Sequence, residues 1–174
     1  MENEPIRTEV DGITFLSIGH YYEGINQWVA HKLKEGDIGC YNFAAKQMAK
    51  MLPKNAVLVP IPGRHGKADQ TLHLCRDIAS YTCLPVVDAL RGKDRESQYE
   101  AKYKGHSLTE EQLGFHKVVS LPSDRIPYLI DNVVDTGTTA KAAVRALVGG
   151  VVLSYAMSDT LLSREQQLSH SFHR

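Results

Sequence analysis

The sequence predicts an α/β protein, with a mostly parallel, twisted sheet flanked by helices on both faces. Two observations carry this prediction. Short apolar runs alternate along the chain with segments whose apolar residues recur at helical spacing, and 174 residues suffice for one domain with a substantial core. We therefore expect residues 1–174 to form a single domain. The runs expected to form core strands are residues 56–61, 84–87, 128–134 and 151–156.

Helices are expected between these strands. The first, over residues 24–34, would place Ile25, Trp28, Val29 and Leu33 on one buried side. Before it, residues 13–22 form a further β-rich run. Similar apolar spacing predicts helices over residues 41–52, 68–81 and 138–148.

The charge balance argues against a nucleic-acid or membrane partner. Lys and Arg number 20, as do Asp and Glu, so no net charge would attract nucleic acid. The first residues are polar, and no apolar stretch approaches the roughly 18 residues of a membrane span. Cys40, Cys75 and Cys83 form no CxxC pair, which suits a reducing compartment. We expect a cytoplasmic protein that binds no membrane and does not bind nucleic acid strongly.

The turn "DTGTT" (135–139), between an apolar run and a helix, has more hydrogen-bonding capacity than a helix cap requires. Gly137 allows a tight bend, and the first amides of the helix carry partial positive charge. Thr136, Thr138 and Thr139 add hydroxyl donors. Such a turn suits a phosphate monoester even without a lysine.

Two polar residues end the apolar run just before this turn. Asp131 and Asn132 can accept hydrogen bonds from a pair of neighbouring hydroxyls, such as those of a ribose. In open α/β sheets, ligands bind beyond the carboxyl ends of the strands. Both this turn and the loop after residues 56–62 are expected there. The combination predicts a sugar phosphate as ligand.

The segment "YLIDNVVDTGTT" resembles the phosphoribosyl-pyrophosphate (PRPP) signature of type I phosphoribosyltransferases. One position departs from it, because Asn132 stands where the second acidic residue is expected. The resemblance extends over about residues 13–158. The order of "YYEGINQWVAHKLKEGD", "VLVPIPGRHG", "SQYEAKYKGHSLTEEQLGFH" and the signature is similar to that of the ComF-like (competence protein F) branch. The N-terminal zinc finger that this branch often carries is missing from the sequence.

The resemblance implies a Mg²⁺-dependent enzyme that transfers phosphoribose from PRPP to a nucleobase or related nitrogen acceptor and releases pyrophosphate. It implies catalytic roles for Asp131 and Asp135, with Asp135 handling the proton of the base. Asp131 and Asn132 would bind the ribose, and Asp131 would also bind the metal. The implied phosphate site is Asp135, Thr136, Gly137, Thr138 and Thr139. The implied pyrophosphate site is Gly63, Arg64, His65, Gly66 and Lys67, in which the two glycines would expose amides and the other residues would supply cations.

Two further segments receive roles from the same resemblance. The polar stretch 89–116 would be a mobile lid that brings cations to the pyrophosphate. Residues 13–35 would form a small hood that selects the acceptor, whereas residues 160–174 are expected to be a mobile tail. The lid cations available for this task are Arg91, Lys93, Arg95, Lys102 and Lys104.

A second class of function stays open alongside the enzyme. A sensor of PRPP or a nucleotide, or a competence-type accessory protein, would keep the same pocket without catalysis. Asn132 keeps this alternative open, because it removes one carboxylate from a site that should attract magnesium. The expected partners are PRPP and a nucleobase or nucleotide, and the prediction leaves room for a homodimer.

Overall fold

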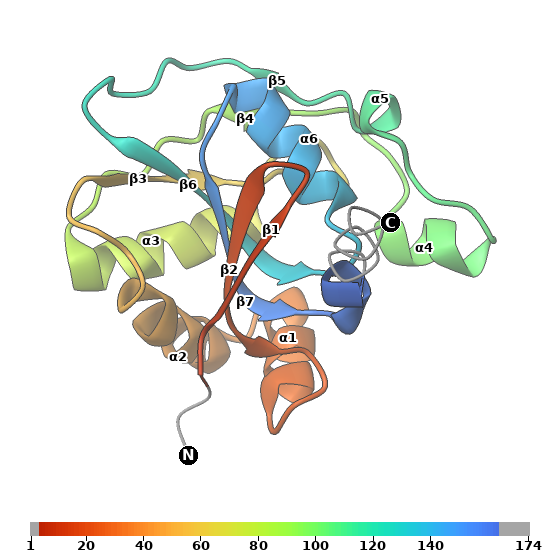
Figure 1. The fold of residues 1–174 in the computed structure, drawn as a ribbon, viewed down its shortest axis with the longest axis horizontal. Helices are drawn as coiled ribbons and strands as arrows, with labels where there is room; N and C mark the ends of the chain where they lie inside the picture. The colour runs from red at the N-terminus through yellow and green to blue at the C-terminus, as the bar shows by residue number, and fades with distance from the viewer. Residues whose placement is uncertain (1–3, 164–174) are drawn as a thin grey trace, which may run out of the picture.

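A five-stranded sheet forms the centre of the computed structural model, which describes residues 4–163 (Figure 1). The strand order is β1-β2-β7-β6-β3. Strands β2, β7, β6 and β3 run parallel, whereas β1 is antiparallel to β2. The predicted α/β fold with a mostly parallel sheet is confirmed. The strand bounds are β1 Ile6–Val10, β2 Ile13–His20, β3 Ala56–Pro60, β6 Ile126–Val134 and β7 Val151–Met157.

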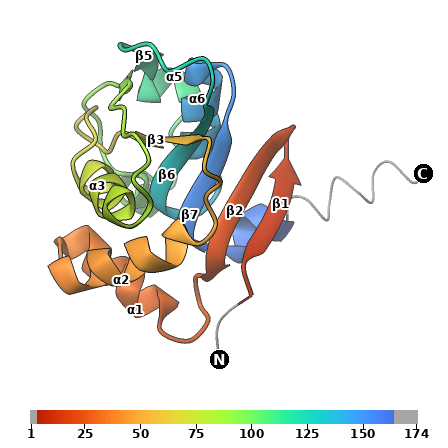
Figure 2. The same ribbon diagram turned by 90° about the vertical axis from the view of Figure 1, so that its left-hand side faces the viewer.

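Helices cover both faces of this sheet (Figure 2). On one face, α1 (Asn26–Glu35), α2 (Ile38–Ala49) and α3 (Gln70–Thr82) share a hydrophobic core with the strands. On the other face, α6 (Thr138–Leu147) buries its Ala-rich side against the sheet. All four helices lie where the apolar spacing predicts them.

The buried side of α1 differs from the predicted one. Val29 and Leu33 are buried, but Ile25 and Trp28 are 56% and 58% exposed. Asn26 points inward instead, where its side-chain N–H group donates to the His20 carbonyl at 2.8 Å and its Oδ1 accepts from the Tyr155 hydroxyl at 3.1 Å. Because these bonds satisfy the side-chain amide, burial of Asn26 costs little free energy. A rule based on hydrophobicity alone therefore misplaces the buried side of α1.

Residues 84–87 form less of a strand than predicted. They lie beside β3 and make one parallel bridge, Leu58 with Val86. The Leu58 N–H group donates to the Pro85 carbonyl and the Val87 N–H group to the Leu58 carbonyl, both at 2.9 Å. Since Pro85 has no N–H group, the ladder is not extended at that residue.

The polar stretch 89–116, which we call the lid, has its own secondary structure. Near its two ends, β4 (Leu90–Arg91) pairs antiparallel with β5 (His116–Lys117). Between these strands lie α4 (Gln98–Tyr103) and α5 (Glu110–Leu113). Each short helix begins with a reciprocal capping box, which fixes its first turn.

The lid also has a small apolar core of its own. Ala101, Leu108 and Leu113 are buried against Ala142 of α6, and Phe115 packs beside them. This core holds the lid on α6. Whether the lid moves stays a prediction.

The N-terminal residues predicted to form a hood are integral to the fold. Strand β2 pairs with β7 inside the sheet, and α1 shares the core on one face. Their role in choosing an acceptor stays a prediction. Most of the predicted tail, residues 160–174, lies outside the described residues, although Leu161 is fully buried in the core beneath α6. Between residues 4 and 163, no helix is both long and apolar enough to cross a bilayer.

Candidate functional site

The carboxyl ends of β3, β6 and β7 meet at one edge of the sheet. Pro60 and Ile130 are in register, and the Ile61 N–H group donates to the Ile130 carbonyl at 3.1 Å. The next residue of β6, Asp131, is opposite Ser154 of β7. The loop of residues 63–67, which follows β3, therefore begins beside Asp131. This is the juxtaposition that a parallel sheet predicts.

Asp131 is a partly buried carboxylate. Burial raises its pKa to about 6. Three effects act in the opposite direction: the Asn132 N–H group donates to Asp131 Oδ1 at 2.8 Å, and the charges of Lys34 and Arg95 are close enough to lower the pKa. A carboxylate whose pKa lies close to neutrality at the end of a strand is typical of a functional site.

Three buried polar atoms have no hydrogen-bond partner among residues 4–163: Asn132 Oδ1, Ser154 Oγ and Arg95 Nε. Each of the three residues is a neighbour of Asp131. Asn132 follows it in β6, and Ser154 is its partner in the register of β7. The charge of Asp131 raises the pKa of Arg95, against the larger lowering effect of burial. An unsatisfied buried polar group costs about 1–3 kcal/mol. Buried atoms of this kind are usually satisfied by a bound polar group or by water.

The turn of residues 135–139 joins β6 to α6. Gly137 is the N-cap of α6 and adopts φ 84°, a left-handed conformation that glycine takes without strain. The hydroxyl oxygens of Thr136 and Thr138 lie 3.1 Å apart. The Thr138 N–H group donates to Thr136 Oγ1 at 3.5 Å, and the first amides of a helix have no partner within it, so the turn combines N–H and hydroxyl groups. That it binds a phosphate stays a prediction.

The loop of residues 63–67 is closed by its own backbone. The Gly63 N–H group donates to the Lys67 carbonyl and the Gly66 N–H group to the Gly63 carbonyl, both at 3.0 Å. The expectation that these two glycines expose amides to an anion is therefore wrong. The side chains of Arg64, His65 and Lys67 are exposed and remain as the cationic groups of the loop.

The base of the lid is fixed to this loop through backbone hydrogen bonds. The Gly92 N–H group donates to the Gly66 carbonyl at 2.9 Å, and the Arg95 N–H group donates to the Arg64 carbonyl at 2.8 Å. Gly66 adopts φ 72°, and a Cβ atom there would lie 2.1 Å from the Gly92 carbonyl oxygen. This close approach permits only glycine at position 66.

Helix α4 of the lid reaches the other segment, the turn of residues 135–139. Gln98 Nε2 donates to Thr139 Oγ1 at 3.0 Å, and Lys102 Nζ lies 3.7 Å from Asp135 Oδ2. The lid therefore contacts both loops of the candidate site. Nothing in the sequence singles out Gln98 beyond its position in the lid.

Of the five lid cations, Arg95 and Lys102 reach the candidate site. Arg95 interacts electrostatically with Asp131, and Lys102 pairs with Asp135. The other three are engaged elsewhere: Arg91 with Asp88, Lys93 with the Glu111 carbonyl and Lys104 with Glu96.

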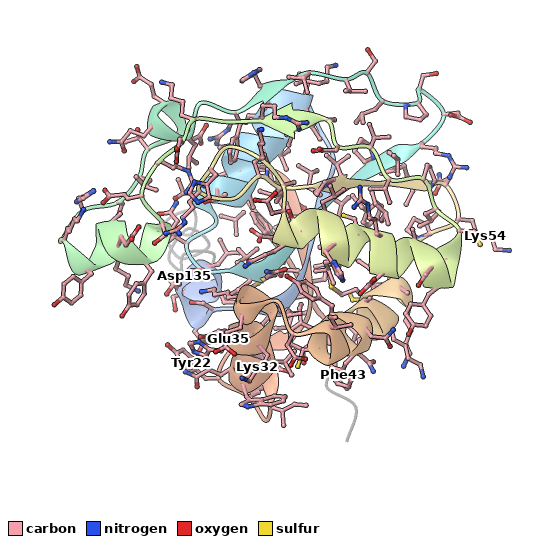
Figure 3. The ribbon with its side chains drawn as sticks, turned by 180° about the vertical axis from the view of Figure 1, so that it is seen from behind. Tyr22, Lys32, Glu35, Phe43, Lys54 and Asp135 are labelled. Atoms are coloured by element: carbon pink, nitrogen blue, oxygen red, sulfur yellow. The ribbon has the colours of Figure 1, made fainter. Side chains whose placement is uncertain are left out.

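Aromatic side chains border the site on the β2 side. Tyr21 follows β2, and its ring packs edge-on against that of Tyr22 with centroids 4.9 Å apart. Burial, then the nearby Tyr22 and Asp135, raises the pKa of Tyr21. Figure 3 shows Asp135 between the lid helix α4 and helix α1, with Tyr22 on the α1 side. In the sequence, the two consecutive tyrosines at the end of a β-rich run were the feature that could have indicated aromatic residues at the site.

The predicted metal residue, Asp131, does not belong to a preformed metal cluster. In the part of the chain that the structure describes, no group of three or more His, Cys, Asp or Glu side chains is arranged to hold a metal ion. A metal at this edge would take most of its ligands from a substrate or from water, as Mg²⁺ often does.

Comparison with solved structures supports the fold. The chain is similar to adenine phosphoribosyltransferase from Thermoanaerobacter pseudethanolicus, with a TM-score of 0.51 and 15% sequence identity, over 95% of this chain and 89% of that one. A second similar structure is the allosteric regulatory enzyme of purine biosynthesis, with a TM-score of 0.43 and 16% identity; the match covers 67% of this chain and 25% of that chain. No family model and no curated protein sequence matches.

Proposed function

We propose that the protein is a phosphoribosyltransferase that uses PRPP and Mg²⁺ to attach phosphoribose to a nitrogen of a nucleobase or related acceptor. In this reaction the nitrogen lone pair forms a bond to the anomeric carbon of the ribose. The bond from that carbon to the pyrophosphate oxygen breaks, and pyrophosphate leaves with the electron pair. The acceptor loses its N–H proton, for which Asp135, 48% exposed and beside the turn, is the proposed base.

The observation that supports this proposal is that three groups of polar residues lie at one edge of the sheet. The turn of residues 135–139 offers hydroxyl and N–H donors for a 5′-phosphate. Asp131 and Asn132 Oδ1 offer acceptors for the two ribose hydroxyls. The cations of the 63–67 loop and Arg95 would stabilise the negative charge that develops on departing pyrophosphate. A sugar bearing phosphate at one end and pyrophosphate at the other suits all three.

The residues at this edge fit a magnesium ion that is held mainly by the substrate. Asp131 supplies one carboxylate, and Asn132 Oδ1 is an oxygen without a partner among the described residues. Oxygen ligands of this kind suit Mg²⁺. When bound, the ion would neutralise pyrophosphate charge and activate it as a leaving group. We also propose that the protein is cytoplasmic, a location that suits its three free cysteines.

The direct test is pyrophosphate release from PRPP across a panel of nucleobases, with and without Mg²⁺. The proposal expects Mg²⁺-dependent release that requires one of the acceptors. Isothermal titration with PRPP separates binding from turnover. Absence of PRPP binding would refute the proposal.

The phosphate turn provides a second test. Replacing Thr136 and Thr139 together by Val should weaken ribose 5-phosphate binding by about 5- to 100-fold, because loss of the two half-buried hydroxyl groups would leave phosphate oxygens without hydrogen-bond donors. Titration calorimetry measures the change. Thr82→Val, in the last turn of α3, is the matched control. Equal affinity of the double variant and the wild type would show that the phosphate binds elsewhere.

One observation favours the alternative, a non-catalytic PRPP or nucleotide sensor or a competence-type accessory protein. Position 132 is Asn, so the site has one carboxylate where the resemblance expects two. In a sensor, PRPP or a nucleotide would bind without Mg²⁺ and without turnover. The titration and the release assay above therefore distinguish the two functions. Assignment to the ComF-like branch is likewise a proposal that rests on the order of the sequence segments.

A further inference from the structure

The lid carries acidic side chains into the region proposed to bind pyrophosphate. Glu100 Oε1 of α4 lies 3.8 Å from Arg64 Nη1, and Asp94 Oδ1 lies 3.2 Å from His65 Nδ1. Arg64 and His65 are two of the three cationic residues of the 63–67 loop. Each of them therefore faces a carboxylate from the lid.

We propose that Glu100 and Asp94 are internal competitors of pyrophosphate, which hold the lid against the 63–67 loop until the anion displaces them. This inference rests on the proposed function and adds a regulatory element to the same site. A carboxylate and a phosphate oxygen are both acceptors for the guanidinium of Arg64. Because the Glu100 carboxylate lies 3.8 Å from Arg64 Nη1, it offsets the charge of Arg64 and repels an anion there, so binding of the anion favours release of Glu100.

The position of the Glu100 side chain is fixed by the capping box of α4. Its Oε2 accepts a hydrogen bond from the Ser97 N–H group at 2.7 Å in the capping box of α4. The backbone and side chain of Ser97 lower the pKa of Glu100, followed by smaller effects of Arg64 and Lys104. The side chain is thus charged at neutral pH, and its position is set by the helix cap rather than by Arg64.

A further charged contact joins the lid to the candidate site. Lys102, also on α4, pairs with Asp135, so the lid neutralises the acidic residue of the 135–139 turn as well as cations of the 63–67 loop. Helix α4 therefore complements both loops in charge. Each pair is exposed to solvent, and such pairs contribute little individually, so a highly charged anion can displace them.

Glu100→Gln is the decisive variant. Gln at the third helix position keeps the capping box but removes the negative charge. The variant should bind inorganic pyrophosphate, titrated with MgCl₂, about 2- to 5-fold more tightly than the wild type, as expected for loss of one exposed ion pair. Asp94→Asn should act in the same direction, because it removes the carboxylate that lies 3.2 Å from His65. Binding of ribose 5-phosphate should not change.

Two controls make the outcome specific. Glu111→Gln removes the same charge from an exposed lid residue. The lid carboxylates that face Arg64 and His65 are those of Glu100 and Asp94, so Glu111→Gln should leave pyrophosphate affinity unchanged. In an Arg64→Gln background, Glu100→Gln should have no effect, because the two residues act on each other.

The outcomes separate this inference from the proposed function. If Glu100→Gln binds pyrophosphate with the same affinity as the wild type, the competition is overturned and the proposed function stays intact. The same holds if Glu111→Gln gains as much affinity for pyrophosphate as Glu100→Gln does. If neither the wild type nor Glu100→Gln binds pyrophosphate or PRPP, the proposed function and the competition both fall.

Discussion

Asp131→Asn should weaken Mg²⁺-dependent PRPP binding by about 10- to 100-fold, as expected when a partly buried group loses the charge that strengthens its contacts with a metal ion and ribose. Asp131 is the carboxylate of the proposed ribose and metal site, and the described residues contain no second acidic group that completes a metal cluster there. Titration calorimetry with PRPP and MgCl₂ measures the loss. Undiminished pyrophosphate release from the variant would contradict the catalytic role of Asp131.

The same substitution should stabilise the folded protein. The pKa of Asp131 rises from 3.8 to about 6 on folding, so the charged carboxylate is disfavoured in the native state. The folded state binds more protons than the unfolded state in this window, and stability falls as pH rises from about 4 to about 6. Asn removes this penalty and can still accept the Asn132 N–H bond. At pH 8, Asp131→Asn should raise the free energy of unfolding by about 1–3 kcal/mol, measurable by chemical denaturation, and this gain should vanish near pH 4.

Asn132→Asp provides the opposite change at the neighbouring position. A second carboxylate should maintain or strengthen Mg²⁺-dependent PRPP binding. It should also lower stability above pH 6, because the side chain at position 132 is only 5% exposed and would be charged next to Asp131. Weaker binding together with unchanged stability would argue against a metal at this edge.

Gly66→Ala should destabilise the protein by about 2–4 kcal/mol, the range for a strained backbone combined with a steric clash. The new Cβ atom would lie 2.1 Å from the Gly92 carbonyl oxygen, and the residue would keep φ 72° only at a cost. Both partners in the clash are backbone, so the 63–67 loop must move. We expect pyrophosphate binding to weaken by about 10-fold or more, since small displacements of a binding group have large effects.

Gly105→Ala is the matched control for this prediction. Gly105 lies in the lid at φ 83°, but a Cβ atom there meets nothing within 4 Å. It should cost about 1 kcal/mol through backbone strain alone and leave pyrophosphate affinity unchanged. Thermal denaturation and pyrophosphate titration of both variants separate strain from the clash. Equal effects of the two substitutions would mean that the contact between Gly66 and Gly92 is unimportant.

The sequence predicted the parts of this fold that depend on local pattern. The apolar run of β6, the turn around Gly137 and the Ala-rich α6 follow from hydrophobic periodicity and turn chemistry, which act over a few residues. The parallel arrangement then brings Asp131 beside the loop after β3 without further information. The side of α1 was misjudged because the bonds that satisfy buried Asn26 come from His20 and Tyr155, the latter far away in the chain.

The arrangement of the lid could not be predicted in the same way. Its contacts with the site join residues distant in sequence, such as Gln98 with Thr139 and Lys102 with Asp135. Its polar composition indicates a surface segment but does not specify which charges meet. The same limit applies to the backbone N–H group of Gly66. A glycine-rich loop suggests that this group is free, but in the folded loop it donates to the Gly63 carbonyl.

The apolar core under the lid has a consequence for how the rate of the proposed reaction would vary with temperature. Opening the lid would separate Leu108 and Leu113 from Ala142 of α6 and expose apolar surface to water. Exposure of apolar surface increases the heat capacity. The enthalpy of lid opening should therefore vary with temperature. If product release requires that opening, its rate should give a curved Arrhenius plot.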